Sequence, residues 1–300
     1  MAIGMFDGVH RGHQAVLARL VAEGRRAAAR TVVATFDCHP ASVVAPDRAP
    51  PLLQTLGQRW RAIAATGVDA AWLIHFDHEF SGQTAAEFVQ GLARGFGRLL
   101  AVYVGEQFHF GRDRSGNVAA LRHWGARLGF VTHALPPYMI EGQIVSSTRL
   151  RECIRAGDLA TACRLLGRTY GLAGTVVRGD QLGHRLGFPT ANLEVSGLAL
   201  PPAGVYVASA RLPGRSLPAV VNLGCRPTLG GKADHLQVEA HLLGFRGDLY
   251  CQELELQFLA KLRDELRFPD LAALRRQIEA DCEAAREQYP GLLAASRVDL

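Results

Sequence analysis

The sequence has no long apolar run and no block of like charges. A membrane-spanning helix needs roughly 18 consecutive apolar residues, and no stretch comes near that length. The N-terminus also lacks the basic segment followed by an apolar segment that marks a secretory signal. Internal repeats and low-complexity segments are missing as well. We therefore expect a globular, cytoplasmic protein without a membrane partner.

Cysteine is sparse and shows no paired spacing. The chain has 6 cysteines, with no CxxC motif and no cluster typical of a zinc site. This number is modest for the chain length and argues against a disulfide framework. We expect reduced thiols that mostly pack in the interior: Cys38, Cys153, Cys163, Cys225, Cys251 and Cys282.

The composition fits an ordinary globular chain. Its 300 residues are 48% hydrophobic and 20% charged, which suits about two domains. The formal net charge of +5 favours anionic ligands. Because the arginines are dispersed rather than run together, small phosphorylated molecules are a better match than nucleic acid.

The first part of the chain, from Ile3 to about Gly167, alternates short apolar runs with helical patterns. The runs TVVATF, AAWLIHF, LLAVYVG and GFVTHAL are typical of strands, and AIGMF precedes them as a first strand. The segments HQAVLARLVAEGRRAAAR and TAAEFVQGLARGF have the apolar spacing of helices. This alternation predicts βαβ units and an α/β domain with a parallel sheet.

From about Tyr170 the pattern changes to strand-like pieces separated by glycine and proline. These pieces include LAGTVVRG, GVYVASARL, LPAVVNLG, LQVEAHLLGF and QELELQFL, and they predict an antiparallel barrel or sandwich. The segment PDLAALRRQIEADCEAAREQY then predicts one long amphipathic helix. We expect two domains, residues 1–167 and 168–300.

The segment GMFDGVHRGHQ, from Gly4 to Gln14, lies where the first strand turns into the first helix. Ligands of open α/β sheets bind at such turns. Gly8 and Gly12 would let a phosphate approach the backbone, and the helix N-terminus offers unpaired N–H groups. His10 and His13 can donate hydrogen bonds to phosphate oxygens. Two alternatives are a metal-binding pair and two solvated turn histidines.

Several motifs of the first part resemble one family. GMFDGVHRGHQ is similar to the HxGH signature of nucleotidylyltransferases, in the form found in prokaryotic bifunctional riboflavin kinase/FMN adenylyltransferases, the FAD synthetases. TFDCHP resembles the TFxPHP motif of that family, GEQFHFGRDRSG its GxDFxFGxxRxG, and VSSTRLR its ISSTxIR. The resemblance implies a Rossmann-like nucleotidyltransferase domain that transfers an adenylyl group from ATP to FMN, giving FAD and pyrophosphate.

The second part carries the flavokinase motifs of the same family. GTVVRGDQLGHRLGFPTANL is similar to its GxGxxLGFPTANL block, and VNLGCRPT and VEAHLLGFRGDLY follow in the expected order. The resemblance implies a six-stranded barrel with a C-terminal helix that phosphorylates riboflavin with ATP. Substrates would then be riboflavin, FMN and ATP, with Mg²⁺ as the cofactor.

Adenylyl transfer to FMN needs no strong base, because the attacking phosphate is already anionic. Catalysis then consists of positioning and of neutralising charge at the α-phosphate. The resemblance assigns His10 and His13 to the ATP phosphates, with Arg151 and Ser147 clamping them from VSSTRLR. A solvated helix face is the alternative for Arg151. Phe108 or Phe110 could stack on the flavin or the adenine, or simply pack in the core.

Three features depart from the family in the first part. Gln107 stands where the family has Asp or Asn, and Cys38 where it has Pro. The extra methylene of Gln107 would re-aim any hydrogen bond to a substrate. Less chain also precedes the first strand than is usual in the family. These features favour, as one alternative, a riboflavin kinase with weak or lost adenylylation.

Riboflavin phosphorylation starts from an alcohol, so a proton acceptor is useful. The resemblance gives this role to Glu239, a carboxylate within an apolar strand, although a solvent-facing position would have the same pattern. Thr190 and Asn192 offer oxygens suited to Mg²⁺. The resemblance also implies a flexible glycine loop over the phosphates, formed by Gly179, Gly183 and Gly187, with His184 and Arg185 as basic residues within it. Asn222 and Thr228 would contact the flavin or the nucleotide.

A second alternative is a flavin- or nucleotide-binding regulator without turnover. His10, His13 and Glu239 argue against it, because a binding protein needs neither phosphate-neutralising imidazoles nor a base.

Overall fold

The computed structural model describes residues 1–226 and 235–298. It divides into two compact units, the first made of residues 1–52 and 56–147 and the second of residues 53–55 and 148–300. None of the helices in the described ranges is long and apolar enough to cross a bilayer. The five cysteines with described side chains form no disulfide, but only Cys282 among them is buried, so the expectation that they mostly pack in the interior is wrong: Cys38, Cys153 and Cys163 are half-buried and Cys251 is exposed.

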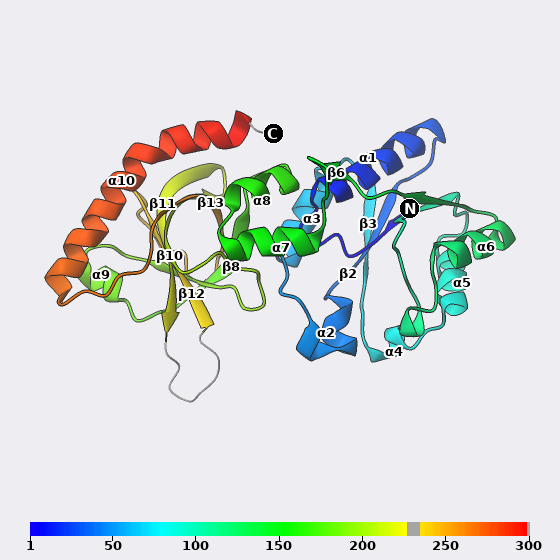
Figure 1. Cartoon of the computed structure of the whole chain (residues 1–300), viewed down its shortest axis with the longest axis horizontal. Coiled ribbons are helices and arrows are strands. Elements are labelled where there is room, and N and C mark those ends of the chain that lie inside the picture. Colours follow the sequence, from blue (N-terminus) through cyan, green and yellow to red (C-terminus); the bar gives the residue numbers. More distant parts are fainter. Residues whose placement is uncertain (227–234, 299–300) are drawn as a thin grey trace. The chain divides into compact units, whose positions relative to one another are not determined.

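The first unit contains a five-stranded parallel sheet in the order β3-β2-β1-β4-β5. Figure 1 labels β2 and β3 of this sheet. This order is that of a nucleotide-binding, doubly wound fold, with the change of direction at β1 and β4. It confirms the predicted α/β domain. Its strands are β1 (Ala2–Ile3), β2 (Val32–Phe36), β3 (Ala70–Ile74), β4 (Ala101–Gly105) and β5 (Val131–Leu135).

Helices cover both faces of this sheet because neighbouring strand residues point to opposite sides. Ala2, Val33 and Tyr103 pack with buried side chains of α1 and α3. Ile3 and Ala34 pack on the other face, with α5 and α6. The helical elements are α1 (Arg11–Arg26), α2 (Pro40–Val44), η1 (Pro46–Arg48), α3 (Leu56–Ala64), α4 (His78–Ser81), α5 (Ala85–Gly95), η2 (Arg112–Arg114) and α6 (Val118–Leu128).

A short antiparallel hairpin follows β5 and leads into two helices. The sequence patterns did not predict this hairpin, whose strands are only two residues each. Gly167 ends the second helix in a left-handed conformation, with a φ of 68°. These elements are β6 (Met139–Ile140), β7 (Gln143–Ile144), α7 (Ser147–Ala156) and α8 (Leu159–Leu166).

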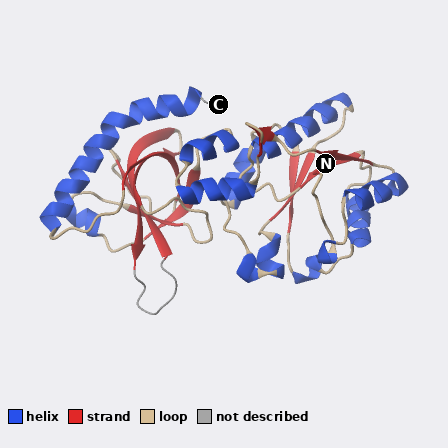
Figure 2. Cartoon of the chain, viewed as in Figure 1, coloured by secondary structure: helices blue, strands red, loops and turns tan. Residues whose placement is uncertain are grey.

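The second unit contains a closed antiparallel barrel in the order β10-β11-β12-β9-β8-β13. Figure 2 shows these strands as one curved group beside the long C-terminal helix. The six strands confirm the flavokinase-type barrel that the resemblance implied. Its elements are β8 (Gly171–Val177), α9 (Leu182–Leu186), β9 (Ala191–Glu194), β10 (Gly204–Leu212), β11 (Arg215–Arg226), β12 (His235–Leu242), β13 (Glu253–Arg263) and α10 (Leu271–Val298).

Helix α10 packs on the outside of the barrel through Cys282 and Ala285, which contact a cluster on β10 and β11. A two-armed ion pair adds to this contact, with Arg263 Nε 2.9 Å from one oxygen of Asp281 and Nη2 2.7 Å from the other. The helix continues beyond the predicted segment and includes Pro290. Burial raises the pKa of the Cys282 thiol to about 11, which keeps it protonated.

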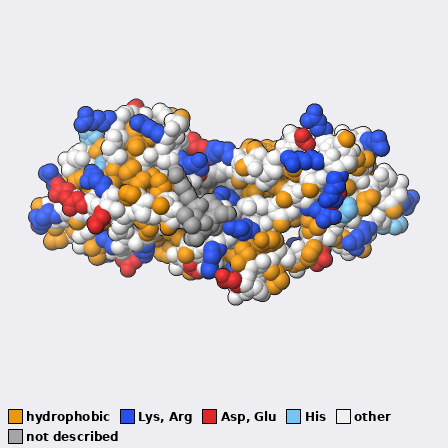
Figure 3. Space-filling view, turned by 90° about the horizontal axis from the view of Figure 1, so that it is seen from above, with side chains coloured by type: hydrophobic (Ala, Val, Ile, Leu, Met, Phe, Trp, Pro, Cys, Tyr) orange, Lys and Arg blue, Asp and Glu red, His pale blue; other side chains and the backbone are white. Residues whose placement is uncertain are grey.

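Lys and Arg side chains are scattered over the face drawn in Figure 3, with acidic side chains among them. This matches the dispersed arginines of the sequence. On this face, charge alone therefore does not mark a functional site.

Candidate functional site

The turn between β1 and α1 has a strained backbone. Phe6, Gly8 and Val9 have positive φ values of 49°, 85° and 38°. Glycine adopts such angles freely, whereas a β-branched valine pays for them. Strain of this kind costs on the order of 1–3 kcal/mol per residue and is concentrated at functional sites. At Gly8 the positive φ needs glycine, and the predicted approach of a phosphate to its backbone stays a prediction.

His10 caps the N-terminus of α1 and stacks on His13. Its Nδ1 accepts a hydrogen bond from the His13 backbone N–H at 3.3 Å, and the two rings lie 3.7 Å apart at 15°. An accepting Nδ1 places the proton of the neutral ring on Nε2. His10 is only 5% exposed, so the alternative of a solvated histidine does not apply to it.

A cavity of about 370 Å³ in the first unit brings most of the predicted residues together. Its lining includes these predicted residues: His10, Gly12, His13, Gln107, Phe108 and Ser147. The rest of its wall is largely apolar and includes Phe6 and Tyr138. A Cβ at Gly12 would lie 3.2 Å from the His10 ring, so glycine keeps this ring close to the helix.

The loop after β4 places the two candidate stacking rings in different surroundings. Phe108 is half-buried and lines the cavity, whereas Phe110 is 7% exposed and packs in the core beneath the sheet. The two rings stack on each other at 5.5 Å. Phe108 is thus the ring that a substrate can reach. Gln107 is exposed beside it.

Ser147 and Arg151 lie one turn apart on α7. The Ser147 hydroxyl donates to the backbone oxygen of Asp7 at 2.8 Å, which fixes the turn between β1 and α1. Arg151 is 6% exposed, which excludes the alternative of a solvated helix face. The sequence analysis did not single out Asp7, although it lies within the quoted motif and is 1% exposed.

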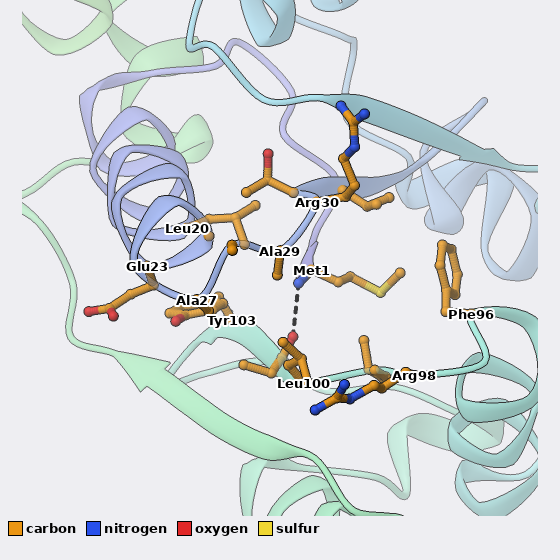
Figure 4. Close-up of a pocket in the computed structure, with 16 residues that line it drawn as sticks. Met1, Leu20, Glu23, Ala27, Ala29, Arg30, Phe96, Arg98, Leu100 and Tyr103 are labelled. Carbon is orange, nitrogen blue, oxygen red and sulfur yellow. Dashed lines mark hydrogen bonds between the residues drawn. The ribbon is translucent and has the colours of Figure 1, made fainter.

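A second cavity of the first unit lies beside the residues at which β1, β2 and β4 begin. Figure 4 shows Met1, Arg30 and Leu100 among the residues that line it. Its volume is about 520 Å³, and none of the predicted residues lines it. The Met1 amino group donates to the Ala101 oxygen at 2.8 Å, and burial lowers the pKa of that amino group to about 6. Size alone does not make this cavity a candidate site.

In the barrel, three predicted residues form a row across neighbouring strands. Glu239 on β12 lies opposite Asn192 on β9 and opposite Asn222 on β11. Residues opposite one another in antiparallel strands have Cβ atoms about 4.5–5.5 Å apart and share a face. Val238 and Ala240, the neighbours of Glu239, are buried in the barrel. The row therefore lies on the face that points away from the barrel interior.

Two glycines lie in close contact with the segment from Phe188 to Asn192. A Cβ at Gly179 would lie 2.4 Å from the Asn192 amide, and one at Gly183 would lie 2.5 Å from the Phe188 oxygen. Only glycine permits this approach. The segment expected as a flexible loop contains the short helix α9, which ends at Gly187 in a left-handed conformation.

Two cavities border this part of the barrel. One of about 370 Å³ is lined by His184 and Thr190, and one of about 560 Å³ by Gly179 and Asn192. Arg185 lines neither of these two cavities and is exposed. Thr228 lies outside the described residues.

His241 is a further residue near this row that the sequence analysis missed. It is two residues beyond Glu239 on β12 and so shares its face. Its Nδ1 lies 2.8 Å from the Pro189 oxygen, directly before Thr190. The alternation in VEAHL was the signal that could have identified it.

Thr190 and Asn192 offer ligands suited to a hard cation. Their neutral oxygens are of the type that Mg²⁺ takes in small number while keeping water. The backbone of Gly179 lies directly against the Asn192 amide, so the loop packs closely around this side chain. Within the described ranges, no group of three or more His, Cys, Asp or Glu side chains is placed to hold a metal ion.

Comparisons with known proteins give matches for both parts of the chain. A family model described as FAD synthetase matches residues 1–149, and one described as riboflavin kinase matches residues 166–289. A bifunctional riboflavin kinase/FMN adenylyltransferase of Pseudomonas fluorescens is 42% identical over 95% of this chain and 91% of its own. The protein of that name from Escherichia coli K12 is 38% identical over 96% and 92%.

A solved structure shows the same fold over nearly the whole chain. It is a crystal structure of a macrolide-efflux protein from Streptococcus pneumoniae, with a TM-score of 0.80 and 28% sequence identity. The match covers 95% of this chain and 93% of the other.

Proposed function

We propose roles for individual residues from the premise that this chain belongs to the family of bifunctional riboflavin kinase/FMN adenylyltransferases. A member of this family phosphorylates riboflavin with ATP to give FMN and ADP. It then transfers an adenylyl group from a second ATP to FMN, giving FAD and pyrophosphate. We assign the second reaction to residues 1–167 and the first to residues 168–300.

In adenylyl transfer, the FMN phosphate attacks the α-phosphorus of ATP, and pyrophosphate leaves. Negative charge grows on the transferred and leaving groups, so donors of positive charge and hydrogen bonds stabilise the transition state. We assign this role to His10 and His13 at the N-terminus of α1, where the helix dipole adds to it. Gly8 and Gly12 keep the backbone open to phosphate, and Arg151 clamps the triphosphate.

Other residues of the same cavity position the substrates. Ser147 holds the turn through its bond to the Asp7 oxygen. Phe108 offers a ring on which the flavin or the adenine stacks, and Gln107 offers an amide for hydrogen bonding. One observation supports this half of the proposal most: a single cavity unites residues predicted from three separate motifs.

In the kinase reaction, Glu239 accepts the proton of the ribityl 5′-hydroxyl as that oxygen attacks the γ-phosphorus of ATP. Thr190 and Asn192 would hold Mg²⁺, which reduces the charge of the triphosphate when bound. Gly179, Gly183 and Gly187 let the loop approach the phosphates, and His184 and Arg185 offset phosphate charge. Asn222 and Thr228 contact flavin or nucleotide. The row Asn192–Glu239–Asn222 supports this half most.

The test is a time course in which each reaction is followed separately. The purified chain receives riboflavin, ATP and Mg²⁺ in one series and FMN, ATP and Mg²⁺ in another, and chromatography separates FMN from FAD. We expect FMN before FAD in the first series and FAD directly in the second. Loss of FAD formation in Arg151→Ala, with FMN formation intact, would support the assigned role of Arg151.

A further inference from the structure

Arg59 is a completely buried arginine in the first unit. It lies on α3 and its relative exposure is 0%, although arginine is almost never fully buried without a partner. Removing a guanidinium from water costs several kcal/mol before compensation. Because α3 also buries Ile63 on this side, Arg59 occupies a core-facing position. Such a position calls for a specific role.

The contacts of Arg59 lead to the turn that carries His10. Its Nη1 donates to the Phe36 oxygen at 2.6 Å and to the Thr35 hydroxyl at 3.4 Å. The Thr35 hydroxyl in turn donates to the Met5 oxygen at 2.8 Å. Arg59 therefore connects the end of β2 with the start of the turn between β1 and α1.

Hydrogen bonding does not account for the whole guanidinium. The Nε and Nη2 atoms of Arg59 have no hydrogen-bond partner among the described residues. A guanidinium selected for its fork of donors would fill them. The features that the protein uses here are therefore the positive charge and the two bonds of Nη1, to the Phe36 oxygen and the Thr35 hydroxyl.

Two buried or half-buried acids lie next to these contacts along the chain: Asp37 directly follows Phe36, and Asp7 is two residues after Met5. Burial lowers the pKa of Arg59, and the charges of Asp7, Asp37 and Cys38, in that order, oppose the shift. Asp37 is also held by its own bonds from His75 at 2.5 Å and from the backbone N–H groups of Cys38 and Phe76. Asp7 is 1% exposed and lies inside the turn, three residues before His10.

A carboxylate within a phosphate-binding turn would repel the triphosphate unless a nearby cation offsets it. We propose that Arg59 is a positioning residue for adenylyl transfer, whose charge offsets Asp7 and whose bond to Phe36 fixes the strand end beneath the turn. This inference rests on the assignment of the His10–His13 turn to the ATP phosphates. Arg59 itself touches no substrate.

The first experiment compares Arg59→Met with Arg59→Lys in the full chain. Methionine removes the charge, and we expect kcat/KM for ATP in FAD formation to fall by about 10²-fold, the cost of a small misplacement at the reacting atoms. Lysine keeps the charge and one donor, so it should stay within about threefold of the parent. Riboflavin phosphorylation by the same preparation should not change.

A matched control removes one positive charge elsewhere in the same unit. Arg26→Met changes the net charge equally, but Arg26 is 72% exposed at the far end of α1. It should leave FAD formation unchanged within about twofold. A loss equal to that of Arg59→Met would overturn the proposal, because general charge would then explain the effect.

A double-mutant cycle tests the link to Asp7. If Arg59 offsets Asp7, then Arg59→Met should cost no more than about threefold when Asp7→Asn has already removed the carboxylate. An equal cost in both backgrounds would refute the link, since a purely structural arginine would be missed in either. Thermal unfolding checks that each variant is folded. Should Arg59→Met not fold, a folded Arg59→Lys that loses about 10²-fold would refute the proposal instead.

The outcomes also separate this inference from the proposed function. If the His10 and His13 variants keep FAD formation, the assignment of the turn fails whatever Arg59 does. If the histidine variants lose it and Arg59→Met does not, only the role of Arg59 fails.

Discussion

The central residues of the two candidate sites come together in different ways. In the first unit, Gly8, His10 and His13 belong to one turn and one helix start. In the second, Asn192, Asn222 and Glu239 come from three strands and meet only through strand pairing. Local motifs suit a site that must present N–H groups and imidazoles to phosphate, because a helix N-terminus already gathers them.

The two reactions also differ in the nucleophile that each site must handle. The nucleophile of adenylylation is already an anion, and we propose hydrogen-bond donors for the first site. The nucleophile of the kinase reaction is an alcohol, and we propose Glu239, between two amides, as the base of the second site. On this proposal the need for a base, and not the shared use of ATP, distinguishes the two sites.

Separating residues 168–300 from the rest of the chain should have the largest effect on the two activities. A fragment of residues 168–300 is of ordinary domain size, and we expect it to fold, to phosphorylate riboflavin and to make no FAD. A longer fragment of residues 148–300 should unfold at a higher temperature, because α8 buries Ala162, Leu165 and Leu166. Circular dichroism and the chromatographic assay measure both properties. A soluble, folded 168–300 fragment without kinase activity would contradict the division.

Removing both imidazoles should abolish one activity and spare the other. For His10→Ala combined with His13→Ala, we expect FAD formation to fall by at least about 10³-fold, since one donor to a developing charge is commonly worth 10²-fold or more. Each single variant should lose a smaller factor. FMN formation from riboflavin should continue in all three. Near-normal FAD output from the double variant would refute the assignment.

Glu239→Gln should give the opposite pattern. Glutamine keeps the size and most hydrogen bonding but cannot accept the proton, so FMN formation should fall by about 10²-fold or more. FMN supplied from outside should still be converted to FAD at the parent rate. The measurement is the initial rate of each step, with thermal unfolding as the check on folding. Parent-like phosphorylation by the folded variant would exclude Glu239 as the base.

Thr190→Ala and Asn192→Ala should have intermediate effects within the second site. Each removes one oxygen proposed for Mg²⁺, so we expect roughly tenfold slower FMN formation at low Mg²⁺ that added Mg²⁺ partly restores. Leu193→Val, a conservative change on the buried neighbour, is the matched control and should show no such Mg²⁺ dependence. A loss that no Mg²⁺ concentration relieves would assign these residues to another role.

The smallest expected effect is a gain in the first site. Adenylylation should be the slower of the two activities, and Gln107→Asn should speed it severalfold by removing the extra methylene, since misplacement by about 1 Å is costly. Steady-state rates with FMN and ATP test this, with riboflavin phosphorylation as the internal reference. An unchanged or lower rate would show that Gln107 is no handicap.

The sequence by itself determined the class of each unit. Alternating apolar runs and helical patterns predicted the parallel sheet, because periodicity reflects which faces are buried. Strands separated by Gly and Pro predicted an antiparallel barrel or sandwich, and the resemblance to the family implied the barrel. The turn and helix start that carry Gly8, His10 and His13 are contiguous, so they could be proposed as a site from the sequence. The resemblance of ordered motifs added the two activities, which the comparisons confirmed.

Tertiary structure decided what depends on strand pairing and burial. No pattern along the chain places Asn192 and Asn222 on either side of Glu239, because register is fixed by the closed barrel. Nor could it distinguish Phe108, at the cavity, from Phe110, in the core. Arg59 appeared in sequence as one more basic residue of a helix. Only packing against the end of β2 removes it from water and gives its Nη1 the Phe36 oxygen as a partner.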